Sequence, residues 1–172
     1  MTFRYKTRAR FANDPVTVHL GNGWHLSLEP LHFDIGMEDA QGDPVYLTAP
    51  VYQLSDGPSI PWFVEWLVSR KDTMHMGFLH DALRSGLKTS NFATDGLMLD
   101  AAMACGLPFW RAWLAFIGVR LGTLIGFKSE APAEVIASAV VRVMEIDGLA
   151  VDEVQYSRGE CRILTKKINQ DD

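Results

Sequence analysis

The sequence predicts an α+β fold in which a small N-terminal antiparallel β-sheet is followed by a helical bundle containing an antiparallel helix pair. Alternating apolar residues at 16–20 and 24–28 flank a Gly-Asn-Gly turn, which is typical of a β-hairpin. After Pro50 the chain is predicted to be mainly helical, with glycine and proline marking the helix ends. We expect one domain over residues 1–172, with a β-rich part at 1–54, a helical part at 62–146 and a tail at 147–172.

Further strands are predicted at 31–35 and 45–47, joined by a turn at 41–44, and the tail at 151–168 is expected to supply a last strand. Basic residues without acids fill the N-terminus, and we interpret them as an exposed edge strand, with a functional arm as the alternative. They are Arg4, Lys6, Arg8 and Arg10. Three histidines of this half share no ligand spacing and are interpreted as strand-face residues: His19, His25 and His32.

Five helical segments are expected after Pro50: 62–68, about 73–85, about 91–105, 108–127, and one that Pro132 opens and that ends near 145. The segment 108–127 is long enough to cross a bilayer, but Arg111 and Arg120 would each cost roughly 2.5–3.5 kcal/mol at its centre. A buried or half-buried core helix is therefore favoured over a membrane-inserting one. Docking on a lipid surface stays open through Trp110, Trp113 and Phe116.

Composition excludes several classes of protein. An apolar fraction of 48% argues against disorder, and a net charge of −5 gives no basic footprint for nucleic acid. Two distant cysteines, Cys105 and Cys161, make neither a disulfide framework nor a metal site, and no signal peptide pattern opens the chain. We expect a protein that folds in a reducing cytoplasm and is not an integral membrane protein.

The candidate catalytic pair is His80 with Asp95. His80 lies six residues before Gly86 and Asp95 lies nine after it, so each is about two helical turns, roughly 11 Å, from the bend. In an antiparallel helix pair the two side chains therefore face each other. A carboxylate opposite an imidazole fixes its tautomer, as a histidine general base requires.

The candidate metal site is the loop residues Asp56 and Gly57 together with Asp81. Asp81 points about 100° round the helix from His80, toward a neighbouring loop. With backbone carbonyls of that loop, the two carboxylates would form an all-oxygen site suited to calcium. The alternative is that the same residues are a structural polar network that satisfies buried groups. His75 points to another face and is interpreted as structural or exposed.

Residues 47–126 resemble an uncharacterised, phage- and prophage-associated family whose pattern is V-P, T-D-G-x-S-I-P, H-D-x-L-Y and a later helical Asp. The matching pieces are AP at 49–50, SDGPSIP at 55–61, HDALR at 80–84, TD at 94–95, GLP at 106–108 and VRLG at 119–122. This resemblance implies a phage-associated domain of unknown function, located in the host cytoplasm or in the phage virion, with phage structural proteins as candidate partners.

The order of Asp-Gly loop, mid-helix His-Asp and later helical Asp is also similar to phospholipases of the secreted A2 type. That similarity implies that His80 is the general base and Asp95 its orienting partner. It also implies that Asp81 and Asp56, with carbonyls near Gly57, bind calcium. Arg84 departs from both families, which carry a tyrosine there that supports the His-Asp network.

Two main hypotheses follow. The first is a calcium-assisted ester hydrolase, acting on a phospholipid that the aromatic segment helps it meet. The second is a virion structural or assembly protein, such as a tail or capsid accessory component, in which the same residues only hold the helices together. An effector that binds a host protein is a third hypothesis, which little in the sequence tests.

Overall fold

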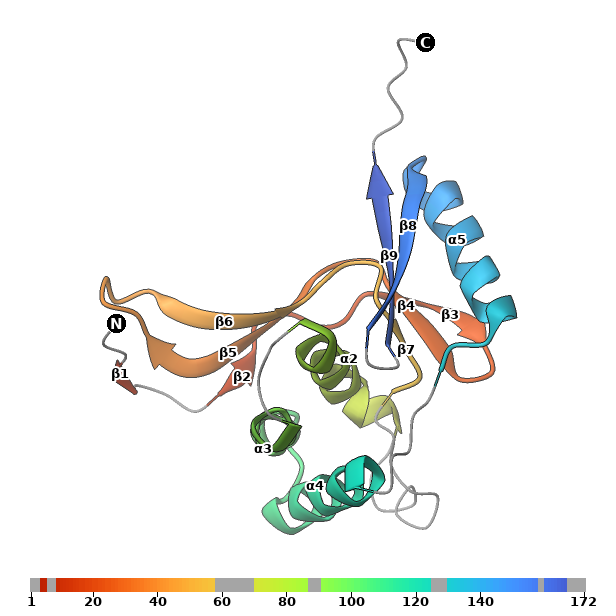
Figure 1. Ribbon diagram of the computed structural model, residues 1–172. Coiled ribbons are helices and arrows are strands. Elements are labelled where there is room, and N and C mark those ends of the chain that lie inside the picture. Colours follow the sequence, from red (N-terminus) through yellow and green to blue (C-terminus); the bar gives the residue numbers. More distant parts are fainter. Residues whose placement is uncertain are drawn as a thin grey trace.

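The computed structural model of the protein describes residues 4–5, 9–57, 70–86, 91–124, 130–157 and 160–166, and it has the predicted α+β class. Antiparallel strands of the N-terminal half form two sheets, helices follow, and a hairpin ends the described chain (Figure 1). The predicted helix at 62–68 lies outside the described residues.

The first sheet is built on β5 (Leu31–Glu38). Its partners are β1 (Arg4–Tyr5), β2 (Arg10–Phe11) and β6 (Pro44–Ala49). β1 and β2 pair with different stretches of β5, so Arg4 and Arg10 lie in short strands as predicted, while Lys6 and Arg8 lie outside the described residues. Exposed Arg10 lies with its Nε 3.6 Å from Oδ2 of buried Asp34. Tyr46 of β6 is exposed while Phe33 of β5 is fully buried, as expected for a sheet with one covered face.

The second sheet has the order β3-β4-β7. β3 (Thr17–Gly21) and β4 (Trp24–Ser27) form the predicted hairpin, and β7 (Leu54–Ser55) pairs with the other edge of β4. The tail differs from the expectation of a single strand. It folds into an antiparallel hairpin of β8 (Ala150–Ser157) and β9 (Glu160–Lys166), because the chain turns back between Ser157 and Glu160.

The described helices are α2 (Arg70–Gly86), α3 (Asn91–Ala104), α4 (Phe109–Leu124) and α5 (Ala133–Asp147). α2 packs on α3 and α3 packs on α4, and all three contribute to one core against the first sheet, with Phe33, Leu79 and Met98 among its buried residues. Of the predicted helical part at 62–146, the last described helix lies apart from these three (Figure 1). α5 packs on β3 and β8, in a second core that includes Leu26 and Val143 (Figure 1).

α4 is the half-buried helix that the sequence favours. Ala112, Ala115 and Val119 are buried against the α2–α4 core. The opposite face exposes large apolar side chains: Phe109, Trp110, Trp113, Ile117, Leu121 and Leu124. Among the described residues, no helix has the length and apolarity needed to cross a membrane.

Gly106 ends α3 in a way that needs a residue without a side chain. Its φ is +82°, and its N–H donates to the Met103 carbonyl at 3.0 Å. The N–H of Leu107 donates to the Ala102 carbonyl at 3.2 Å, which completes a Schellman motif. This C-cap fixes the short connection that brings α4 back alongside α3.

We expect Gly106→Ala to lower the free energy of unfolding by about 1–2 kcal/mol, because a side chain disfavours positive φ. Gly96→Ala, in the interior of the helix that Gly106 caps, is the matched control. A Cβ at position 96 meets no atom within 4 Å, so this change should raise stability by about 0.5–1 kcal/mol. Urea unfolding of both variants measures the difference, and equal effects would contradict this account of the cap.

Candidate functional site

The candidate site starts from His80 and Asp81, two adjacent polar residues of α2, a helix that is buried on several sides. In α2, Leu79 and Leu83 face the core shared with α3, and Phe78 and Ala82 face the first sheet. His80 directly follows Leu79 and is only 7% exposed. A polar side chain in such a position must be paired to offset the loss of its hydration.

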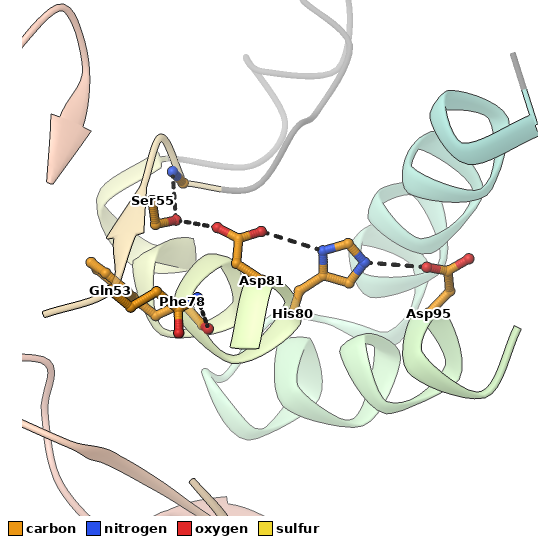
Figure 2. A network of polar contacts seen from close by, with 7 residues as sticks. Gln53, Ser55, Phe78, His80, Asp81 and Asp95 are labelled. Atoms are coloured by element: carbon orange, nitrogen blue, oxygen red, sulfur yellow. Dashed lines mark hydrogen bonds and ion pairs between the residues drawn. The ribbon is translucent and has the colours of Figure 1, made fainter. Parts of the chain in front are cut away.

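The contact predicted between His80 and Asp95 is present. The Nε2–H of His80 donates to Oδ1 of Asp95 in α3 at 3.2 Å (Figure 2). Asp95 is 1% exposed, and its other oxygen accepts a hydrogen bond from Arg120 of α4 at 2.9 Å. One buried carboxylate therefore joins three helices.

Charge decides the protonation of Asp95. Burial by itself raises the pKa of this carboxyl, but the hydrogen bonds and positive charges of His80 and Arg120 outweigh burial. The pKa of Asp95 is therefore lowered, and it is a carboxylate at neutral pH. Arg120 was not among the predicted site residues. An arginine inside an apolar helix was the available signal, since such a cation usually needs a partner.

Asp81 faces the segment that begins at Ser55, as predicted, and it contacts Ser55 at the end of β7. The Ser55 hydroxyl donates to Oδ2 of Asp81 at 2.6 Å and accepts from the Gly57 N–H at 3.1 Å (Figure 2). Oδ1 of Asp81 lies 3.7 Å from Nδ1 of His80, which is close enough for an ion pair. We call Ser55, Asp81, His80, Asp95 and Arg120 the His80 network.

His80 thus lies between two carboxylates, one on each ring nitrogen. Burial lowers its pKa, but Asp81 and Asp95 together outweigh burial, while Arg84 opposes them slightly. The net result is a raised pKa for His80, so the network favours the imidazolium. Arg84, where a tyrosine was expected, therefore acts on the site through its charge.

Asp56 and Gly57, the other predicted metal residues, directly follow β7, and Asp56 is partly buried. Within the described part of the chain, no group of three or more His, Cys, Asp or Glu side chains is placed to hold a metal ion. The calcium site of Asp56, Gly57 and Asp81 therefore stays a prediction.

The other histidines lie outside the His80 network. His75 of α2 has its Nε2 3.2 Å from exposed Asp14, and His32 bonds to Thr48 across the first sheet. Both have the structural or strand-face positions that the sequence predicts. His25 is a strand-face residue too, but it pairs with His19 on one side and with Ser55 on the other. Burial, and then the neighbouring His19, lower the pKa of His25.

Comparison with known proteins gives one result. The family model described as "protein of unknown function (DUF1353)" matches residues 31–119, just over half of the 172-residue chain. The chain belongs to the DUF1353 family. The DUF1353 segment begins with β5 and ends in α4, so it includes His80, Asp81 and Asp95 and stops one residue before Arg120. No curated protein and no solved structure matches the chain.

The raised pKa of His80 in this DUF1353 protein predicts a pH-dependent stability. The folded state binds the His80 proton more tightly than the unfolded state, so this contribution is complete below about pH 6.5 and is lost as pH rises through the raised value. The free energy of unfolding should therefore fall as pH rises above about 6.5.

His80→Asn should reduce the pH dependence of the free energy of unfolding, because the variant lacks the titrating group. His75→Asn, in a histidine–aspartate pair on the same helix but outside the His80 network, should leave the slope unchanged. Urea unfolding of the three proteins across this pH range provides the measurement. A wild-type slope in His80→Asn would show that His80 is not the group responsible.

Proposed function

We propose that this DUF1353 protein is a phage-associated hydrolase of ester bonds in which His80 is the general base. The observation that carries the proposal is that the two ring nitrogens of His80 have different partners. Nε2 is hydrogen-bonded to Asp95, which Arg120 holds in turn. Nδ1 lies 3.7 Å from Asp81, beyond hydrogen-bond distance, and the Asp81 side chain is 16% exposed where that of Asp95 is 1%. Nδ1 is therefore the nitrogen that a water molecule can use, once the proposed calcium ion holds Asp81 and His80 is neutral.

In the proposed reaction, the oxygen of a water molecule attacks the carbonyl carbon of the ester while Nδ1 of His80 takes its proton. Asp95 fixes the ring through Nε2–H and stabilises the imidazolium that forms. As the bond to the leaving oxygen breaks, His80 returns the proton to that oxygen. The products are a carboxylic acid and an alcohol, and His80 is neutral again.

Calcium is the proposed ion, with Asp56, Gly57 and Asp81 as the residues that would hold it. The donors are two carboxylates and a backbone carbonyl, all oxygen atoms, which suit calcium. Oδ2 of Asp81 already accepts from Ser55, but a carboxylate oxygen has a second lone pair, so the donor set fits the ion. Bound calcium would supply positive charge to the oxyanion of ester hydrolysis.

The exposed apolar face of α4 supports a lipid ester as the substrate class. Six large apolar side chains lie on this face, and the helix sequence contains no acidic residue. Exposed Arg111 lies over the Trp110 ring at 5.1 Å. Aromatic rings beside a cation, on a helix without acids, match an anionic lipid surface.

A second candidate function is a virion structural or assembly component, and the protonation of His80 favours it. An imidazolium between two carboxylates is a stable polar network but has no free lone pair for a base. The His80 network also links β7 with α2, α3 and α4, as a structural role requires. Presence of the chain in purified phage particles at a fixed stoichiometry would support this candidate, and its absence from them would count against it.

We expect the protein to hydrolyse mixed phosphatidylcholine and phosphatidylglycerol vesicles in calcium, and His80→Asn to reduce the rate by at least about 100-fold, as for loss of a general base. His75→Asn is the matched control and should keep the wild-type rate. Titration of released fatty acid measures both. Unchanged hydrolysis in His80→Asn, or no hydrolysis by the wild type, would overturn the hydrolase proposal.

Calcium binding is predicted to raise the melting temperature. An ion present at one hundred times its Kd adds about 2.7 kcal/mol to the free energy of unfolding. For a chain of this size this raises the melting temperature by roughly 5–10 °C. Magnesium should have a smaller effect, since the smaller ion demands a stricter octahedral geometry.

The calcium response should be lost in Asp81→Asn and in Asp56→Asn and kept in Asp100→Asn, an exposed change on α3. Thermal unfolding with chelator and with millimolar ion tests all four proteins. The calcium site would be rejected if wild type and Asp81→Asn respond alike.

A further inference from the structure

The second sheet places two imidazole rings side by side outside the His80 network. His19 of β3 and His25 of β4 are directly opposite in the antiparallel register, so their side chains project from the same face of the sheet. The ring centroids are 4.9 Å apart, and the ring planes are tilted by 65° instead of stacked. We call these residues the His19–His25 pair.

The spacing of the His19–His25 pair matches that of two ligands of one metal ion. Imidazoles that bind a tetrahedral zinc ion at about 2.0–2.1 Å per nitrogen have ring centres roughly 5 Å apart. His19 is exposed and His25 is partly buried, so the pair is open to solvent on one side. An exposed side chain can adjust its rotamer to turn a nitrogen toward an ion at little cost.

A second observation points to a ligand. Nδ1 of His25 is buried and has no hydrogen-bond partner in the part of the chain that the structure describes. Buried polar atoms are rarely left in that state, and an unpaired one costs about 1–3 kcal/mol. The other histidines with a described polar contact, His32, His75 and His80, each have a protein oxygen within 3.2 Å of a ring nitrogen.

We propose that His19 and His25 form a two-histidine binding site for a transition-metal ion of the zinc class. Imidazole nitrogens suit zinc, copper and nickel, whereas calcium prefers oxygen, so this site is chemically distinct from the one at Asp81. Two protein ligands leave coordination positions open for water or for a donor atom of a bound molecule. The proposal does not depend on the hydrolase activity.

The His19–His25 pair is connected to the His80 network through Ser55. His25 is opposite Ser55 of β7, so His19, His25 and Ser55 form one row across the sheet, from the exposed strand to a buried hydroxyl. Ser55 donates its hydroxyl to Asp81. A metal-bound ligand on the His19–His25 pair would therefore lie at the Ser55 end of the His80 network. The pair itself precedes the segment that matches the DUF1353 family.

Zinc chloride titrated into the full chain, followed by calorimetry, tests the site. We expect one equivalent to bind the wild type, and His19→Gln and His25→Gln each to weaken binding by at least about tenfold, since loss of even an outer-shell partner costs 10–100-fold. His32→Gln, a histidine of the first sheet, should bind like the wild type. Asp81→Asn should also keep the zinc affinity, which separates this site from the proposed calcium site.

His19→Cys distinguishes the loss of a zinc ligand from a failure of the variant to fold. Cysteine is a zinc ligand, so this variant should retain binding where His19→Gln does not. The proposal is wrong if millimolar zinc does not bind the wild type, or if His19→Gln binds zinc as tightly as the wild type does. It is also wrong if His32→Gln weakens binding as much as His19→Gln.

Discussion

The arrangement of the helices depends on one buried carboxylate, that of Asp95. It accepts a hydrogen bond from His80 of α2 on one oxygen and from Arg120 of α4 on the other. A carboxylate with 1% exposure is tolerable only with such partners, because an unpaired buried charge costs several kcal/mol. These directional bonds act together with the packed apolar core between α2, α3 and α4 and specify which polar residues meet.

The His80 network lies where the two cores of the protein meet. The first sheet packs with α2, α3 and α4, and the second sheet packs with α5 and the C-terminal hairpin. β7 and the residue before it join these parts. Ser55 bonds to Asp81, and the Gln53 side chain donates to the Phe78 carbonyl at 3.3 Å (Figure 2). A polar site at such a junction can hold the two parts together and can also bind a molecule at their common surface.

The geometry of the His80 network suits both a catalytic and a structural role, and the protonation state of His80 distinguishes the two roles. Two carboxylates favour the imidazolium form of His80, which stabilises the fold but cannot accept a proton. A general base needs Asp81 to be directed to another positive partner. A cation at the oxygen atoms of Asp81 and Asp56 would provide that partner, so the proposed calcium ion and the proposed base are linked by electrostatics.

The sequence by itself determined the α+β class, the hairpin of β3 and β4, the helices α2 to α5 and the meeting of His80 with Asp95. These features follow from local turn chemistry, apolar spacing and the fixed rise of a helix. Tertiary structure alone decided that Arg120 completes the pair, that Ser55 of β7 is a partner of Asp81, and that His19 faces His25. It also decided that α5 leaves the bundle and that the tail forms a hairpin. Such contacts join residues far apart in the chain, so their geometry depends on how whole elements pack, which no local pattern encodes.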